Sequence, residues 1–297
     1  MKKTIITIIF ILITITGCAT NDTDNHEFEI VVSTTMLGDL VKQIGQDHVH
    51  VTMLFGPGID PHLAQPTGGD TRIIQNAKLV VFSGLNLETH FSQILNAYED
   101  KTIQVGDMLD KGRLLFIDEN EIDPHFWFSV PLWQEAARIV GDALKEADPS
   151  HATVYESNTV SYIETLNELN QWIETKVSEL ENHQKILVTA HDAFGYFAST
   201  YGFEVFAIAG LSTEGEVTTQ NINLVADVII ENHVKSIFIE STVPQTTIDS
   251  VVAEVERRGS SVKVGNELYS DSLGSEIDSE YTNAIKHNVN SIVEGLK

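Results

Sequence analysis

The sequence predicts an α/β protein in which two parallel-sheet lobes are joined by one long rigid helix. In each half of the chain, short apolar segments rich in β-branched residues alternate with segments of helical spacing, an order typical of parallel sheets covered by helices. Between the halves, residues 152–181 contain neither Gly nor Pro and repeat apolar residues every three or four positions, which indicates a continuous helix. A chain of 297 residues can form two such lobes.

The first lobe is expected to span residues 29–150. A carboxylate can accept hydrogen bonds from free backbone amides, so Asp70 is the expected N-cap of one of its helices. Ser129 and Pro131 are expected to open a later helix. The predicted strands are 29–36, 50–55, 79–84 and 102–107, and the predicted helices between them are 37–46, 71–77 and 88–98.

The second lobe is expected to span residues 183–297. Gly202 follows a helical segment and should close it, because glycine readily adopts the left-handed conformation that ends many helices. The predicted strands are 185–191, 204–210, 236–241 and 261–268, and the predicted helices are 192–202, 218–232, 245–258 and 276–296.

The connecting segment, residues 151–182, contains a helix of about 45 Å if 30 residues are helical. Its apolar stripe admits two interpretations. A coiled-coil dimer arm is one alternative, but the stripe covers only about four heptads and includes Trp172. We therefore predict a rigid helix laid across both lobes of a monomer, which limits the lobes to a modest relative movement.

The N-terminus has the features of a lipoprotein leader. Residues 4–16 form an apolar run of thirteen residues behind two lysines, too short for a membrane span but typical of a signal peptide. The run ends in ITGC, residues 15–18, which resembles the bacterial lipobox. We therefore expect residues 1–17 to be a signal peptide, Cys18 to be lipidated, and residues 18–28 to be a tether on the outer face of the cell membrane. An ordinary secretory signal with an incidental cysteine is the alternative.

Charge and cysteine content exclude several classes of function. The formal charge is −25, and cleavage before Cys18 would remove two lysines and leave −27. A chain this acidic is a poor candidate for binding nucleic acid or an anionic membrane surface. Because Cys18 is the only cysteine, an intramolecular disulfide and a cysteine-based metal site are excluded.

Three of the eleven histidines follow predicted strands or precede a predicted helix. His62 and His125 each close an Asp-Pro-His tripeptide, in GPGIDPHLAQP and EIDPHFWFS, and His191 ends the strand 185–191. Ligands of parallel α/β sheets bind beyond the carboxyl ends of the strands, so a cleft between the lobes would bring these three histidines together. Proline holds the preceding Asp extended, and its carboxylate can accept local backbone amides as in an Asx-turn. His90 is a weaker candidate, and the other histidines are expected to be solvated or near helix ends.

A carboxylate is needed to offset the charge of a metal ion held by neutral imidazoles. Asp271, in GNELYSDSLG, follows a predicted strand of the second lobe and is the candidate. Three imidazoles and a carboxylate suit a divalent transition metal with four or five ligand atoms. Glu240 ends another strand and is predicted to accept a ligand N–H, with surface pairing as the alternative. Glu214 and Glu216 are expected to be solvated, with a position at the lip of the cleft as the alternative.

Four motifs in this order behind a lipobox carry a resemblance to a known family: GIDPHLAQPT, IDPHFWFS, TAHDAFGYF and NELYSDSLG. The chain resembles the metal-binding lipoproteins of ABC importers for manganese and zinc, the cluster A-I solute-binding proteins. The resemblance implies that one Mn²⁺ or Zn²⁺ is bound per chain in the cleft between the lobes and delivered to an ABC permease with a separate ATPase subunit. The family's ligands fall on His62, His125, His191 and Asp271.

The sequence departs from the family pattern at positions that concern the metal. Ser129 stands where the second motif usually has Asp, and the chain lacks the His-rich loop of many zinc members. His191 occupies a position where dedicated manganese members often carry Glu. Imidazole favours zinc and carboxylate favours manganese, while the Irving–Williams order predicts tighter zinc binding. We favour manganese as cargo with zinc also bound.

Other functions remain as alternatives. An open three-histidine zinc site with Asp271 or Glu240 as general base would make a surface hydrolase. A siderophore or cobalamin receptor would need a broad cationic cleft, which 18 Lys and Arg residues disfavour, and no feature indicates an adhesin. Since ligand histidines must be neutral, metal affinity is expected to fall as the pH drops through about 6–6.5.

Overall fold

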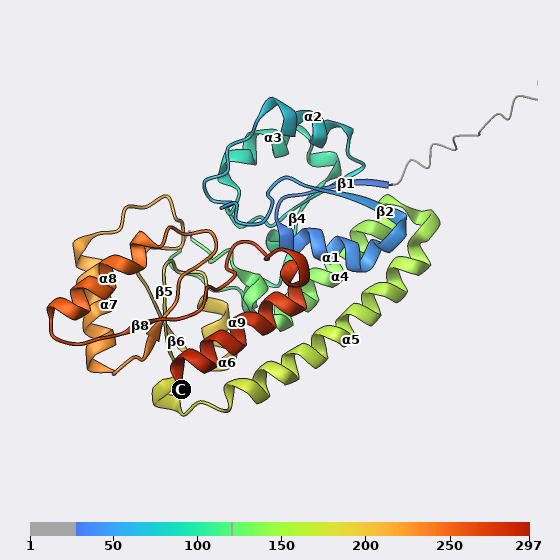
Figure 1. Ribbon diagram of the computed structural model, residues 1–297. Coiled ribbons are helices and arrows are strands. Elements are labelled where there is room, and N and C mark those ends of the chain that lie inside the picture. Colours follow the sequence, from blue (N-terminus) through green and yellow to red (C-terminus); the bar gives the residue numbers. More distant parts are fainter. Residues whose placement is uncertain (1–27, 120) are drawn as a thin grey trace, which may run out of the picture.

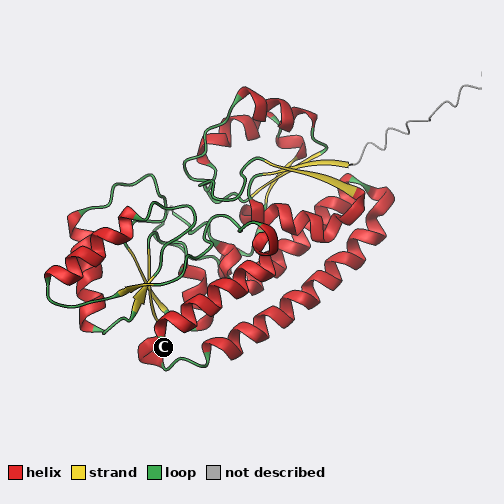
Figure 2. Cartoon of the chain, viewed as in Figure 1, coloured by secondary structure: helices red, strands yellow, loops and turns green. Residues whose placement is uncertain are grey.

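The computed structural model describes residues 28–119 and 121–297 (Figures 1 and 2). The predicted signal peptide, the lipobox with Cys18 and the tether up to residue 27 lie outside the described residues. In the part that is described, no helix combines the length and the apolar character needed to cross a membrane. Two groups of parallel strands, each covered by helices, are joined by a long helix, as the sequence predicts.

The first lobe is built on a four-stranded sheet in the order β2-β1-β3-β4, and every strand pair is parallel. The central strands are buried on both faces, as their continuous apolar runs require. The carboxyl ends of all four strands therefore meet at one edge of the sheet. The elements are β1 (Phe28–Val32), α1 (Thr35–Gly45), β2 (Val49–Met53), α2 (Gly68–Asn76), β3 (Leu79–Phe82), α3 (Ser92–Ala97) and β4 (Thr102–Gln104).

The second lobe contains two short parallel pairs, β5 with β6 and β7 with β8. A hydrogen bond of 3.0 Å from Phe238 N to Val188 O continues the arrangement from β7 to β5. The elements are β5 (Ile186–Thr189), α6 (Gly195–Tyr201), β6 (Glu204–Ala207), α7 (Thr219–Glu231), β7 (Ser236–Ile237), α8 (Thr246–Arg257), β8 (Lys263–Val264) and α9 (Tyr281–Leu296).

The connecting helix α5 (Ala152–Val177) packs along α1, α9 and the preceding helix α4 (Val130–Ala147) (Figure 1). Gly141 permits close contact between α4 and α5, since a Cβ there would lie 2.3 Å from the Thr159 hydroxyl. The apolar stripe is thus buried within this chain rather than exposed as a coiled-coil seam. Its buried members are Tyr155, Tyr162, Leu166, Leu169, Ile173 and Val177.

The last helix, α9, also connects the lobes, which the sequence did not predict. It packs against both α1 and α5. The Tyr281 ring stacks on Trp133 with centroids 5.0 Å apart, and the Tyr281 amide donates to Asp39 of α1 at 3.0 Å. Two helices, α5 and α9, therefore hold the lobes in a defined relative position.

One predicted helix cap is wrong. The N-cap of α2 is Thr67, whose hydroxyl accepts the Asp70 amide, while the Asp70 carboxylate accepts the Thr67 amide at 2.7 Å. Asp70 is therefore the third helical residue of a capping box. Ser129 stands at the N-cap of α4 with Pro131 in its first turn, as predicted, although the Ser129 side chain makes no capping hydrogen bond. Gly202 closes α6 with φ of 77°, as predicted.

Several predicted strands and helices are too long. The predicted strand 29–36 ends at Val32, because Thr34 already caps α1. Residues 192–194 precede α6 instead of forming its first turn. The strands around residues 236–241 and 261–268 keep ladder pairing over two residues each, and an isolated bridge joins Glu240 to Leu268 beyond them. In each case the chain leaves regular structure where it approaches the edge between the lobes.

Candidate metal centre

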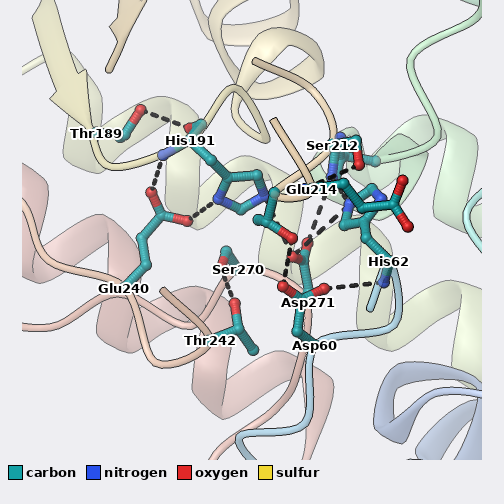
Figure 3. A network of polar contacts seen from close by, with 12 residues as sticks. Asp60, His62, Thr189, His191, Ser212, Glu214, Glu240, Thr242, Ser270 and Asp271 are labelled. Carbon is teal, nitrogen blue, oxygen red and sulfur yellow. Dashed lines mark hydrogen bonds and ion pairs between the residues drawn. The ribbon is translucent and has the colours of Figure 1, made fainter. Parts of the chain in front are cut away.

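The four predicted ligands lie together between the lobes. Figure 3 labels three of them, His62, His191 and Asp271. His62 follows β2 and His125 precedes α4, both in the first lobe, whereas His191 follows β5 and Asp271 follows β8 in the second. One ligand atom from each residue lies within 4.8 Å of the others. The side chains are 5% exposed at His62 and 0% exposed at the other three. The cluster is therefore closed to solvent.

Nε2 of His191 and both oxygens of Asp271 face the centre of the cluster without a hydrogen-bond partner among the described residues. Nε2 of His62 lies 3.3 Å from Nε2 of His125. The Asp271 oxygens lie 3.2 Å from Nε2 of His191 and 3.4 Å from Nε2 of His125, yet neither oxygen makes a hydrogen bond to any described residue. Buried polar atoms without partners are costly, and a cation at their centre would satisfy them all. The donor set fits one divalent transition metal.

Both Asp-Pro-His corners form the predicted local turn. Oδ1 of Asp60 accepts the His62 amide at 2.8 Å, and Oδ1 of Asp123 accepts the His125 amide at 2.9 Å. In each tripeptide the proline between Asp and His restricts the Asp to extended geometry, so each imidazole projects from a rigid turn. Less conformational entropy is then lost when the ring binds a ligand.

The two corners differ in what else the carboxylate contacts, which the identical tripeptides did not reveal. Oδ1 of Asp123 also lies 2.7 Å from Nδ1 of its own His125. The second oxygen of Asp60 instead accepts the hydroxyl of Thr213, from the other lobe. Asp123 therefore orients an imidazole, whereas Asp60 links a histidine corner to a distant loop. No local sequence signal distinguishes the two roles.

Glu240 holds His191 by two contacts. Oε1 accepts the His191 amide at 2.9 Å, and Oε2 lies 2.5 Å from Nδ1 of the same residue (Figure 3). Glu240 is 3% exposed, so this is not a surface pair. A carboxylate on Nδ1 turns Nε2 toward the cluster and increases its basicity toward a metal ion.

Electrostatics distribute the protons unequally among the three imidazoles. Burial, together with the other two imidazoles and against the attraction of Asp271, lowers the pKa of His62 to about 4. Burial also acts to lower the pKa of His125, but Asp123 and Asp271 outweigh it and raise that pKa to about 9. Glu240 and Asp271 likewise outweigh burial and raise the pKa of His191. Without metal, His125 and His191 therefore carry protons at neutral pH.

Asp271 stays ionised in spite of complete burial. Burial acts to raise its pKa, but the charges of His191 and His125 outweigh burial and hold the pKa well below its usual range. The carboxylate is thus available as an anionic ligand. A metal ion that replaces the two protons would preserve the charge balance of the cluster.

Other residues weighed from the sequence lie outside the cluster. Nε2 of His90 lies 2.7 Å from Oε1 of Glu214, a contact between the lobes near the cluster. Glu216 is exposed. Of the remaining described histidines, several pair with nearby groups: His50 with Glu29, His151 with Asp148, His183 with Glu181, and His287 with the carbonyl of Glu267.

Replacing Glu240 by Gln is expected to lower the affinity for Zn²⁺ about 10- to 100-fold, the usual effect of losing a carboxylate behind a histidine ligand. Gln keeps the size of the side chain but removes the charge that stabilises the orientation of His191. Competition with a chromophoric chelator measures the change. Glu181→Gln is the matched control, because Glu181 pairs with the exposed His183. Equal affinities of the two variants would contradict this role of Glu240.

Comparison with known proteins places the chain among metal-binding proteins. The family profile described as "Zinc-uptake complex component A periplasmic" matches residues 30–295. The chain is 34% identical over 298 residues to the manganese-binding lipoprotein MntA of Bacillus subtilis, covering 98% of this chain and 97% of that protein. It is 35% identical over 271 residues to the zinc-binding protein TroA of Treponema pallidum, covering 90% of this chain and 88% of that protein.

A solved structure extends this similarity to the fold. The periplasmic zinc-binding protein TroA of Treponema pallidum superposes with a TM-score of 0.89 at 34% identity. The match covers 91% of this chain and 99% of the other. The α/β architecture with parallel sheets and a long helix is therefore common to both chains.

Proposed function

This chain belongs to the family of zinc-uptake complex component A proteins, and on that premise we propose that it captures a divalent transition metal and delivers it to the permease of an ABC importer. Members of the family are solute-binding proteins, and the chain is not an enzyme. The hydrolase alternative finds no support among its relatives.

One observation carries the proposal: the buried Asp271 carboxylate, which has no hydrogen-bond partner among the described residues, stands among three imidazoles. We assign the ligand atoms to these residues, with Glu240 behind His191. Three nitrogens and one or two oxygens supply four or five ligand atoms. A hydrolytic centre needs an open position for water and substrate. The near-complete burial of the four side chains favours capture of the ion over catalysis. The proposed ligands are His62, His125, His191 and Asp271.

For the identity of the cargo we propose Mn²⁺, with Zn²⁺ also bound. One relative is named for manganese and another for zinc, at nearly the same identity to this chain. The Irving–Williams order predicts that a site with three imidazoles binds zinc more tightly than manganese in vitro. The anionic oxygen of Asp271 supports manganese. The physiological cargo then depends on metal availability as well as affinity.

The proposed partners are a membrane permease and a separate ATPase subunit, as the names of relatives from ABC transporters imply. An extracytoplasmic location agrees with those names. We further propose that residues 1–17 are removed and that the monomer is anchored through lipidated Cys18 and a tether that ends where β1 begins at Phe28. In this scheme residues 29–150 and 183–297 form the lobes and residues 151–182 the connection.

Elemental analysis tests the proposal directly. The mature chain is purified without added metal and its manganese and zinc contents are measured, followed by competition between the two ions. We expect up to one transition-metal ion per chain and saturation at one equivalent. Titrations that show no binding of either ion would refute the proposed function. Binding of zinc together with complete exclusion of manganese would refute the assignment of the cargo.

A further inference from the structure

The burial of the metal cluster raises the question of how an ion reaches it. Its four side chains are between 0% and 5% exposed, so some part of the protein must move before an ion can enter. Helices α5 and α9 each pack against elements of the first lobe and extend toward the second (Figure 1). A local movement is therefore easier than a rotation of whole lobes.

A loop of the second lobe, residues 211–217, lies beside the cluster. It is anchored at one end by the hydrogen bond from Asp192 N to Gly210 O, at 3.2 Å. At the other end the Thr218 hydroxyl caps α7 by accepting the Asn221 amide at 3.2 Å. The loop residues between these anchors are largely exposed or half-buried. Figure 3 shows Ser212 and Glu214 of this loop close to His62.

Two contacts hold this loop against the first lobe. The Thr213 hydroxyl donates to Oδ2 of Asp60. Oε1 of Glu214 lies 2.7 Å from Nε2 of His90, and these side chains are 51% and 31% exposed. A single hydrogen bond and a partly exposed ion pair are both weak contacts.

Several other contacts between the lobes are buried and involve the backbone. The Leu273 amide donates to the Thr35 hydroxyl at 2.7 Å. The Tyr281 amide donates to Asp39, and the Trp127 indole donates to the Ser270 carbonyl at 3.0 Å. Breaking these three hydrogen bonds would expose apolar surface and leave buried polar groups without partners. Opening at residues 211–217 costs less, because one of its two polar contacts to the first lobe is part-buried and the other is exposed.

Asp60 connects the loop to a ligand of the proposed metal site. One oxygen of its carboxylate accepts the His62 amide, and the other accepts the Thr213 hydroxyl. Release of Thr213 therefore loosens the corner that positions His62. In the other Asp-Pro-His corner the carboxylate of Asp123 contacts His125 instead, so the first corner alone is linked to this loop.

We propose that residues 211–217 form a lid over the metal site, latched by Thr213 to Asp60 and by Glu214 to His90, and that the ion enters and leaves when this latch opens. The inference rests on the proposed function, because the lid controls access to that same site. Asp60 and Thr213 are positioning residues in this scheme, not metal ligands. The latch forms a barrier in both directions, so it sets the exchange rates more than the equilibrium.

Thr213→Val tests the lid, since valine keeps the shape of the side chain and removes the donor. We expect the association and dissociation rates of Zn²⁺ both to rise about three- to tenfold, the effect of one hydrogen bond, with Kd changed less than about threefold. Stopped-flow mixing with Zn²⁺ gives the association rate, and mixing of the loaded full chain with excess chelator gives the dissociation rate. Glu214→Gln should raise both rates by about twofold or less, because an exposed pair contributes little.

Two comparison variants distinguish the lid from a general effect of the Thr→Val substitution and from the loss of a metal ligand. Thr165→Val makes the same substitution at an exposed position of α5 and should leave both rates unchanged. His62→Ala removes a proposed ligand and should raise dissociation and Kd together without faster association. Rates of Thr213→Val equal to those of the unaltered chain, or a rise in dissociation matched by a rise in Kd, would overturn the lid. Failure of the unaltered chain to bind Zn²⁺ would overturn the proposed function itself.

Discussion

Replacing His191 by Ala is expected to lower the affinity for Zn²⁺ by about 100- to 1000-fold, whereas replacing His183 by Ala should leave it unchanged. Binding of zinc by four protein ligands is worth about 10–16 kcal/mol, so one ligand accounts for roughly 3–4 kcal/mol, which corresponds to this loss. Nε2 of His191 lies in the cluster, while the His183 side chain is 75% exposed on the surface. Chelator competition measures both variants.

A second substitution tests the metal site with a smaller risk of a folding defect. His191→Ala leaves the buried Glu240 without its imidazole, which destabilises the fold as well as the site. Asp271→Asn keeps the volume of the side chain and removes only its charge, so it should lose a similar amount of affinity. Thermal unfolding of the metal-free variants identifies any loss of fold. Equal metal affinities of His191→Ala and His183→Ala in folded protein would remove His191 from the site.

The positions of the site residues were predictable because they follow from strand direction. His62 follows a strand of the first lobe, and His191 and Asp271 follow strands of the second. Parallel strands bring the loops that follow them to one edge of their own lobe. This rule needs only the strand sequences and their common direction. It does not need side-chain detail, and together with a cleft between the lobes it predicts the group that the structure brings together. That this group binds a metal stays a prediction.

The contacts behind the site depend on the arrangement of distant segments and were less predictable. Asp60 and Asp123 occupy identical tripeptides, yet one contacts Thr213 across the lobes and the other contacts its own histidine. The choice depends on which residues the rest of the fold places near each carboxylate. The double contact of Glu240 with His191 likewise requires two strands to lie in register.

Strand lengths were overestimated for a related reason. Residues 236–241 and 261–268 are apolar and β-branched enough for longer strands, but ladder pairing covers only Ser236–Ile237 and Lys263–Val264. Beyond these pairs the backbone turns toward Glu240 and Asp271 and makes single hydrogen bonds instead of a ladder. Local β-propensity predicts that these residues can form a strand. It does not predict that the backbone must leave the strand to reach a site between the lobes.

Metal affinity is expected to rise with pH up to about 9, well beyond the range that free imidazoles would give. An unperturbed histidine loses its proton near pH 6.5, so affinity would level off above that value. In this site Asp123 and Asp271 raise the pKa of His125 to about 9, and Glu240 and Asp271 raise that of His191, in both cases against burial. The metal-free protein therefore holds two protons at pH 7, and the ion must displace both.

The direction and size of the pH dependence follow from the competition between the metal ion and the protons on His125 and His191. Each displaced proton changes the binding constant by about tenfold per pH unit, so the His125 proton alone gives about tenfold per unit up to about pH 9, and the His191 proton makes the dependence steeper wherever it is still bound. His62, with its pKa lowered to about 4, is already neutral and adds nothing in this range. Calorimetry in buffers of different ionisation enthalpy counts the protons, and chelator competition gives the affinity at each pH. An affinity that levels off above pH 7, or binding without proton release, would show that His125 and His191 are already neutral. The carboxylates behind them would then orient the rings without holding protons.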